Sequence, residues 1–145
     1  MIAPDTASLL KNDERVILRL RSLYDRFGYD RYKMSKFEEY ELYVRNKDFL
    51  VSDRVITFND TDGRLLALKP DVTLSIIKNT TDRRGCVSKV YYDENVYRIS
   101  GATSRFKEIM QTGLECIGDI GEYDIYETVH LAVLSLASIS EKKNL

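Results

Sequence analysis

The sequence is poor in the residues that most often build metal centres and disulfide scaffolds. Its 145 residues include no tryptophan, two cysteines, two prolines and a single histidine, His130. Cys86 and Cys116 lack the spacing of metal ligands and are too few for a disulfide framework, which is typical of reduced thiols in a cytoplasmic protein. We interpret His130 as structural or exposed, and we expect no metal site and no cofactor.

Charge of one sign and long apolar runs are also missing. There are 22 Lys and Arg against 23 Asp and Glu, a net charge of -1, so the overall field does not favour nucleic acid and we do not expect tRNA as a partner. No signal peptide and no apolar run long enough to span a bilayer is visible, so we expect no membrane association. The length predicts one domain over residues 1–145 with a proper core.

Two alternating segments lie between Val87 and Gly118, separated by a short polar connection that contains Gly101. Successive side chains of a strand point to opposite faces, so the second segment places Gln111, Gly113 and Glu115 on one face. The glycine predicts an open space between an amide and a carboxylate, in which a ligand could lie flat.

The first segment brings a guanidinium to a sheet face as well. Val90, Tyr92, Glu94, Val96 and Arg98 share that face by the same alternation. An Arg, a Gln and a Glu converging on one sheet surface would form a small-molecule site. The alternative is that the polar alternation marks only a solvated sheet face.

The remaining segments alternate between helical and extended patterns. In order, the patterns predict a helix over about Glu14–Phe27 capped by Asn12 or Asp13 and ended by Gly28, a short strand over Tyr29–Met34, a helix over Phe37–Val44, an irregular stretch over Asn46–Asp53, a hairpin of Val55–Phe58 and Arg64–Leu68 around Asp62-Gly63, a helix with Pro70 in its first turn, and a last helix over about Tyr123–Ile139 with an apolar stripe of Ile125, Val129, Ala132, Val133 and Leu136. This order predicts an α+β domain with a largely antiparallel sheet.

Asp71 and Thr73 lie near the start of the helix that follows Pro70. One interpretation is structural, because a carboxylate and a hydroxyl both stabilise the first turn of a helix. The other places both side chains at the mouth of a site beside the hairpin.

Three stretches resemble the catalytic core of class II histidyl-tRNA synthetases. They are FGYDRYKMSKFEEYELY, LALKPDVTLSIIKN and the run from VYRIS to MQTGLECIG. The resemblance is closest to non-charging paralogues of these enzymes, the regulatory subunits of ATP phosphoribosyltransferase, and it covers nearly the whole chain. It implies a class II synthetase-like α+β core, largely antiparallel and flanked by helices, that is incomplete here because motif 3 is absent.

The resemblance also implies a histidine site. Asp71 and Thr73 match the acidic residue and the threonine that hold the amino group of bound histidine and its neighbourhood. Arg98 matches the arginine that opens motif 2 and contacts the nucleotide phosphate and the amino-acid carboxylate. Gln111 and Glu115 match the residues that grip the amino group and the imidazole. These are suitable partners for an ammonium, a carboxylate and an imidazole N–H.

Departures from the synthetase pattern argue against catalysis. Ser100 stands where active synthetases have a glutamate, two residues after Arg98, and the loop ISGATSRFKEI lacks the arginine and proline of the family and is one residue shorter. Arg105 and Lys107 keep positive charge as a remnant of the nucleotide site, and Ser35 replaces the proline of motif 1. Without the motif 3 arginine we expect no catalytic residues and no activation of histidine by this chain.

Two functions therefore stand as hypotheses. The first is a non-catalytic regulatory subunit in histidine biosynthesis, which keeps a histidine site or its relic and acts through a short-form ATP phosphoribosyltransferase catalytic subunit. The second is a fragment of a histidyl-tRNA synthetase, an ATP-dependent ligase. Aspartate at position 71, Ser100, the eroded loop and the balanced charge favour the first, and a third, weaker possibility is an interaction module that has lost ligand binding. The resemblance also implies a homodimer through the first helix and the region Tyr29–Glu41.

Overall fold

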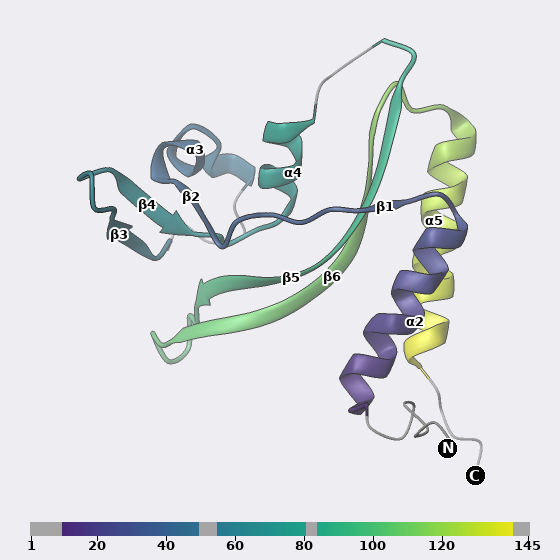
Figure 1. Cartoon of the computed structure of the whole chain (residues 1–145), viewed down its shortest axis with the longest axis horizontal. Coiled ribbons are helices and arrows are strands. Elements are labelled where there is room, and N and C mark those ends of the chain that lie inside the picture. Colours follow the sequence, from purple (N-terminus) through teal and green to yellow (C-terminus); the bar gives the residue numbers. More distant parts are fainter. Residues whose placement is uncertain (1–9, 50–54, 81–83, 141–145) are drawn as a thin grey trace, which may run out of the picture. The chain divides into compact units, whose positions relative to one another are not determined.

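Helices and strands alternate along residues 10–49, 55–80 and 84–140, the parts of the chain that the computed structural model describes. In order they are α2 (Asn12–Arg26), β1 (Asp30–Arg31), β2 (Phe37–Glu39), α3 (Tyr40–Arg45), the 3-10 turn η1 (Lys47–Phe49), β3 (Thr57–Asn59), β4 (Leu65–Leu68), α4 (Thr73–Asn79), β5 (Val87–Ile99), β6 (Phe106–Gly118) and α5 (Glu122–Ile139), labelled as in Figure 1. Helices combined with mostly antiparallel strands confirm the predicted α+β class.

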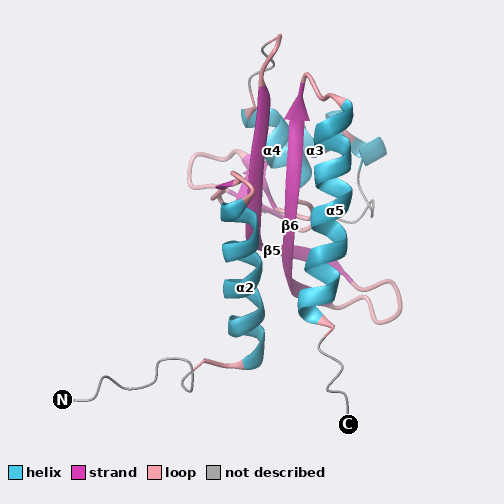
Figure 2. Cartoon of the chain, turned by 90° about the vertical axis from the view of Figure 1, so that its right-hand side faces the viewer, coloured by secondary structure: helices cyan, strands magenta, loops and turns pink. Residues whose placement is uncertain are grey.

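The chain divides into two compact units. Unit 1 comprises Met1–Arg31, Asp82–Tyr91 and Leu114–Leu145, and unit 2 comprises Tyr32–Thr81 and Tyr92–Gly113. Strands β5 and β6 run through both units, side by side (Figures 1 and 2). The expectation of a single domain stays a prediction. Among the described helices, none combines the length and the apolar character needed to cross a bilayer.

In unit 1, helices α2 and α5 pack against each other. Strand β1 pairs with β5 in parallel, so that Asp30 lies opposite Val90. Its core combines side chains of both helices and of the strands: Leu20, Leu23, Tyr24, Tyr29, Tyr91 and Leu131. Helix α2 ends as predicted, because Gly28 has φ +76 and its amide donates to the Asp25 carbonyl at 3.1 Å.

The start of α2 differs from the sequence prediction. Asn12 is already helical and Lys11 occupies the position before the helix, so the predicted cap by Asn12 or Asp13 is wrong. The Glu14 carboxylate accepts the Lys11 amide at 2.7 Å. Glu14, the third residue of the helix, therefore satisfies the backbone amide of the residue that precedes the helix.

Helix α5 turns its apolar stripe outward. The predicted helix is confirmed, but Ile125, Val129, Val133 and Leu136 of its stripe are 59–68% exposed. Asp124 and Glu127 lie instead within ion-pair distance of Lys89 on β5, and Glu127 is buried. The helical period located the helix, but it could not reveal which side packs within the unit.

Unit 2 contains a three-stranded antiparallel sheet in the order β2-β4-β3. The predicted hairpin is confirmed: Gly63 has φ +80, and its amide donates to the Asp60 carbonyl at 3.0 Å. The predicted helix over Phe37–Val44 is wrong in its first three residues, which pair with β4 so that Phe37 lies opposite Leu68. Pairing with a strand far along the sequence overrides the local helical spacing, and α3 begins only at Tyr40.

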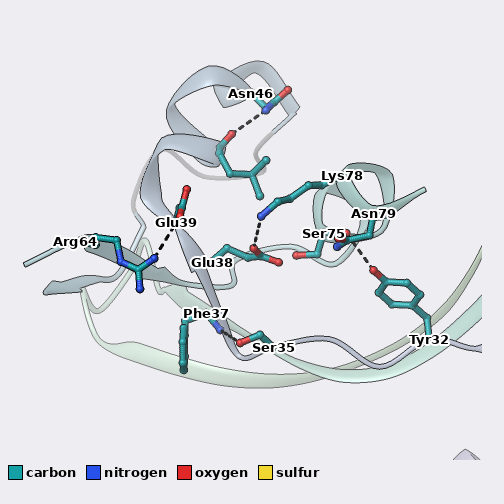
Figure 3. Close-up of polar contacts among 11 residues, drawn as sticks. Tyr32, Ser35, Phe37, Glu38, Glu39, Asn46, Arg64, Ser75, Lys78 and Asn79 are labelled. Carbon is teal, nitrogen blue, oxygen red and sulfur yellow. Dashed lines mark hydrogen bonds and ion pairs between the residues drawn. The ribbon is translucent and has the colours of Figure 1, made fainter. Parts of the chain in front are cut away.

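Helix α4 starts later than predicted. It begins at Thr73, so Pro70 lies outside its first turn and that part of the prediction is wrong. The physical reason is that the Lys69 and Pro70 carbonyls bond to β5 instead of opening a helix. Side chains then tie α4 to its neighbours: Lys78 Nζ lies 2.9 Å from Glu38 Oε2, and the Tyr32 hydroxyl donates to the Ser75 carbonyl at 3.4 Å (Figure 3).

Candidate functional site

The hairpin of β5 and β6 positions most of the predicted site residues. The Asp119 amide donates to the Cys86 carbonyl at 3.1 Å at one end, and the Ser100 amide donates to the Arg105 carbonyl at 2.9 Å at the other. Both hydrogen bonds define the same register. That register places Tyr92 opposite Gly113 and Glu94 opposite Gln111.

The space over Gly113 is filled rather than open. A Cβ atom added at Gly113 would lie 2.6 Å from the Tyr92 Oη and 2.8 Å from its Cζ, and Tyr92 itself is buried. The prediction that a ligand could lie flat over this glycine is therefore wrong. A cross-strand tyrosine occupies the volume that the missing side chain leaves.

Asp71 takes the structural role weighed for it from the sequence. Its Oδ1 accepts the Thr73 amide at 2.8 Å and the Leu74 amide at 3.4 Å, which are the first donors of α4. The carboxylate thus satisfies amides that have no partner within the helix and complements its positive end. Asp71 and Thr73 are both half-buried.

Arg98 lies against the segment that precedes α4. Its Nε donates to the Pro70 carbonyl at 2.9 Å, and the amide of the neighbouring Tyr97 donates to the Lys69 carbonyl at 2.8 Å. The structure therefore brings the guanidinium next to the residue that precedes Asp71. In unit 2 the structure thus brings two predicted site residues, Asp71 and Arg98, to the same backbone segment.

Lys69 and Glu94 form an ion pair beside this segment that the sequence did not predict. The Lys69 side chain has no exposed surface, and its Nζ lies 3.1 Å from Glu94 Oε2. A signal was present, since Lys69 interrupts the otherwise apolar run LALKP and Glu94 was placed on the predicted face of Arg98.

Gln111 presents a buried acceptor. Its Oε1 has no exposed surface and no hydrogen-bond partner among the described residues. A buried carbonyl oxygen without a donor is costly, at about 1–3 kcal/mol. An ammonium or N–H group of a ligand, or a water molecule, would satisfy it.

The other predicted residues lie elsewhere along β6 and its turn. Glu115 is half-buried and belongs to unit 1, whereas Asp71, Arg98 and Gln111 belong to unit 2. Arg105 and Lys107 are exposed at the turn end of the hairpin.

Electrostatics in unit 1 centre on Lys89 and α5. Lys89 Nζ lies 2.6 Å from Glu127 Oε1 and 3.8 Å from Asp124 Oδ1. The hydrogen bond to Glu127 raises the pKa of Lys89. Burial raises the pKa of the Cys116 thiol. Within the described ranges, no group of three or more His, Cys, Asp or Glu side chains is arranged to hold a metal ion.

Comparisons with known proteins agree with the family resemblance of the three sequence stretches. A family model described as histidyl-tRNA synthetase matches residues 5–144. An ATP phosphoribosyltransferase regulatory subunit from Bacillus mycoides (strain KBAB4) is 30% identical over 107 residues, which are 72% of this chain and 26% of the relative. A histidine–tRNA ligase from Dictyoglomus turgidum is 31% identical over 127 residues, 82% of this chain and 31% of the relative. The chain thus spans about a quarter to a third of the length of these curated relatives.

Solved structures share the fold. A histidine–tRNA ligase subunit from Alicyclobacillus acidocaldarius has a TM-score of 0.67 at 26% identity and covers 96% of this chain and 40% of its own. The ATP phosphoribosyl transferase complex from Thermotoga maritima includes a chain with a TM-score of 0.67 at 21% identity, covering 88% of this chain and 42% of its own. At that identity the second likeness concerns the fold alone.

Proposed function

Because the chain belongs to the histidyl-tRNA synthetase family, we propose that it acts as a non-catalytic regulatory subunit of ATP phosphoribosyltransferase, the enzyme of the first step of histidine biosynthesis. Its partner in this proposal is a short-form catalytic subunit. The Bacillus mycoides relative, named as such a regulatory subunit, supports this choice.

The turn between β5 and β6 is the observation that carries the proposal. The Ser100 amide donates to the Arg105 carbonyl at 2.9 Å, and the Ser104 amide donates to the Ser100 carbonyl at 2.8 Å. The connection is therefore short and closed at Ser100, which offers a hydroxyl where the synthetases it resembles offer a carboxylate. Arg105 and Lys107 lie exposed beside it. A short turn of this kind suits a nucleotide-site remnant better than a loop that wraps a nucleotide.

The experiment that tests this role measures phosphoribosyl transfer by a short-form catalytic subunit titrated with this chain. We expect the rate to rise with the concentration of the chain and then to saturate. A rate that stays constant across the titration would contradict the proposal.

The ligase alternative is supported by the Dictyoglomus turgidum relative, a histidine–tRNA ligase whose sequence is 31% identical to this chain. Pyrophosphate exchange with histidine and ATP separates the two functions. We expect no exchange above background, because Ser100 stands where active synthetases have a glutamate and the loop that follows it is one residue shorter. Clear exchange would replace the regulatory role by the ligase role.

We further propose that the chain binds histidine through Asp71, Thr73, Arg98, Gln111 and Glu115. The buried Gln111 oxygen supports an ammonium or N–H donor at that position. The Arg98 guanidinium would receive the carboxylate, and Glu115 would accept the imidazole N–H.

Calorimetry on Glu115→Ala tests the assignment. Loss of one partner of a charge-assisted hydrogen bond costs about 2 kcal/mol or more, which is about thirtyfold in affinity. Arg98→Ala should weaken every amino acid that has a free carboxylate, whereas Glu115→Ala should weaken histidine selectively. Equal histidine affinity in wild type and Glu115→Ala would show the assignment of Glu115 to be wrong.

A homodimer completes the proposal, with contacts from α2 and the region Tyr29–Glu41. The simplest form is a two-fold interface that uses the same surface of both copies. Sedimentation at high micromolar concentration checks it. A strict monomer would count against the dimer and would leave the regulatory role to the transfer assay.

A further inference from the structure

Lys69 is a lysine whose charged end lies inside the protein. Its side chain has no exposed surface, while the side chain of its partner Glu94 is 19% exposed. An ammonium removed from water is costly unless it is paired and hydrogen-bonded. The position of Lys69 is therefore tied to Glu94, and through Glu94 to β5.

Stability alone is a weak explanation for this pair. The desolvation of two charges often cancels their attraction, so an apolar pair of similar volume is frequently as stable or more stable. A buried pair does impose a geometry, because any shift that separates its members leaves a charge buried without a partner. The pair between Lys69 and Glu94 therefore points to a requirement for position.

Lys69 and the two residues that follow it each make a separate contact. The Lys69 carbonyl accepts the Tyr97 amide at 2.8 Å, and the Pro70 carbonyl accepts Arg98 Nε–H at 2.9 Å. Asp71 then caps α4 through its Oδ1. The residue that carries the buried ammonium thus begins the segment that orients Arg98 and ends at Asp71.

The contacts on β5 fix the segment at two points. Glu94 and Arg98 are four residues apart on the same strand, so their side chains leave the same face. Lys69 binds the first and the Pro70 carbonyl binds the second. A slip of this segment by one residue along β5 would break both contacts together.

We propose that the Lys69–Glu94 ion pair is the positioning element of the candidate histidine site, which holds the Asp71 carboxylate and the Arg98 guanidinium in fixed places along β5. This inference rests on the site proposed above. Lys69 touches no ligand in this scheme; it acts through Pro70 and Asp71.

The experiment compares two double variants that remove the same charges. Lys69→Met with Glu94→Gln removes the buried pair. Lys78→Met with Glu38→Gln removes a second Lys–Glu pair of unit 2, whose atoms lie 2.9 Å apart and whose lysine side chain is 42% exposed (Figure 3). Both are measured by amide hydrogen exchange and by the NMR signal of Arg98 Nε–H.

We expect the first double variant to speed exchange of the Tyr97 amide about tenfold or more and to remove the protection of Arg98 Nε–H. Amides of the hairpin of β3 and β4, such as Asp60 and Leu68, should exchange as in wild type. The control pair should leave Tyr97 and Arg98 unchanged. Equal behaviour of the two double variants at these groups would overturn the proposal.

A milder change keeps the test decisive if the first double variant does not fold. Glu94→Gln alone keeps the shape of the side chain and removes its charge, and it should speed Tyr97 exchange in the same direction. Unchanged exchange of Tyr97 in this variant would also overturn the proposal.

Histidine titration provides the second readout. Where wild type binds histidine, Lys69→Met with Glu94→Gln should weaken binding about tenfold or more, and the control pair should not. Equal affinity in the two double variants would contradict a positioning role. If wild type binds no histidine, the site proposed above fails, while the exchange experiment still decides whether the ion pair positions Asp71 and Arg98.

Discussion

Replacement of Gly113 by alanine tests whether Tyr92 fills the space over the sheet. The new Cβ would lie 2.6 Å from Tyr92 Oη and 2.8 Å from Cζ, closer than carbon and oxygen atoms can approach without movement. Tyr92 is buried, so its ring has little room to move. Overpacking of this kind costs about 1–3 kcal/mol.

A second effect opposes this cost. Alanine restricts the unfolded chain more than glycine does, which stabilises the folded state by about 0.4–1 kcal/mol where the native backbone is compatible. Gly101 offers a matched control, because its φ is not positive and no atom lies within 4 Å of an added Cβ. We therefore expect Gly101→Ala to be neutral or slightly stabilising, and Gly113→Ala to be less stable than Gly101→Ala by about 1–3 kcal/mol.

Urea unfolding followed by far-UV circular dichroism measures the difference, since the chain has no tryptophan for fluorescence. The combination of Gly113→Ala with Tyr92→Leu removes the crowded atoms and should cost less than the sum of the single changes. Equal stabilities of Gly113→Ala and Gly101→Ala would falsify the packing of Tyr92 over Gly113.

Three further predictions concern other contacts. Lys89→Met should lower the free energy of unfolding by about 2 kcal/mol at neutral pH, because it leaves Glu127 buried without its cation. The pKa of Lys89 is raised in the folded protein, so wild type loses this stabilisation as the pH rises through that pKa. The free energies of unfolding in urea of wild type and Lys89→Met should therefore become equal at alkaline pH. Cys86 is exposed and the pKa of Cys116 is raised, so a thiol reagent should modify Cys86 first, as peptide mass spectrometry would show, and the reverse order would contradict the burial of Cys116. Asp71→Ala should cost about 0.5–2 kcal/mol in urea unfolding through loss of the cap on α4, and no loss of stability would contradict that role.

The β5–β6 hairpin shows what local pattern can predict. Its two strands together begin at Val87 and end at Gly118, as the alternation and the polar connection around Gly101 indicated. A long hairpin is a local structure, because each strand finds its partner across a short turn. The hairpin of β3 and β4 was predicted for the same reason.

Pairings between distant segments were beyond the sequence pattern. Phe37–Glu39 carries helical spacing but forms a strand because β4 supplies its hydrogen bonds. The ion pair joins Lys69, in the connection between β4 and α4, to Glu94 of β5, and no periodicity links the two residues. The packing of Tyr92 over Gly113 depends on the register of the hairpin. Alternation along each strand does not determine which residues of the two strands lie opposite each other.

The candidate site divides along the same line. Strand alternation already singled out Arg98 and Gln111, and the helix start singled out Asp71. The family resemblance added their roles toward histidine, and their places in unit 2 follow from the structure. The local role of Asp71 at a helix start was already one of its two interpretations. The contact of Arg98 with the Pro70 carbonyl could not be predicted, because it depends on how the segment before α4 lies along β5.

The outward apolar side of α5 bears on how the protein behaves in solution. This side exposes four apolar side chains to solvent, those of Ile125, Val129, Val133 and Leu136. A net charge of -1 provides almost no long-range repulsion between molecules. Colloidal stability should therefore be lowest near the isoelectric point of about 5.9 and should improve as the pH moves away from it. Because the hydrophobic effect is entropic near room temperature, cooling should disperse such association and warming should promote it.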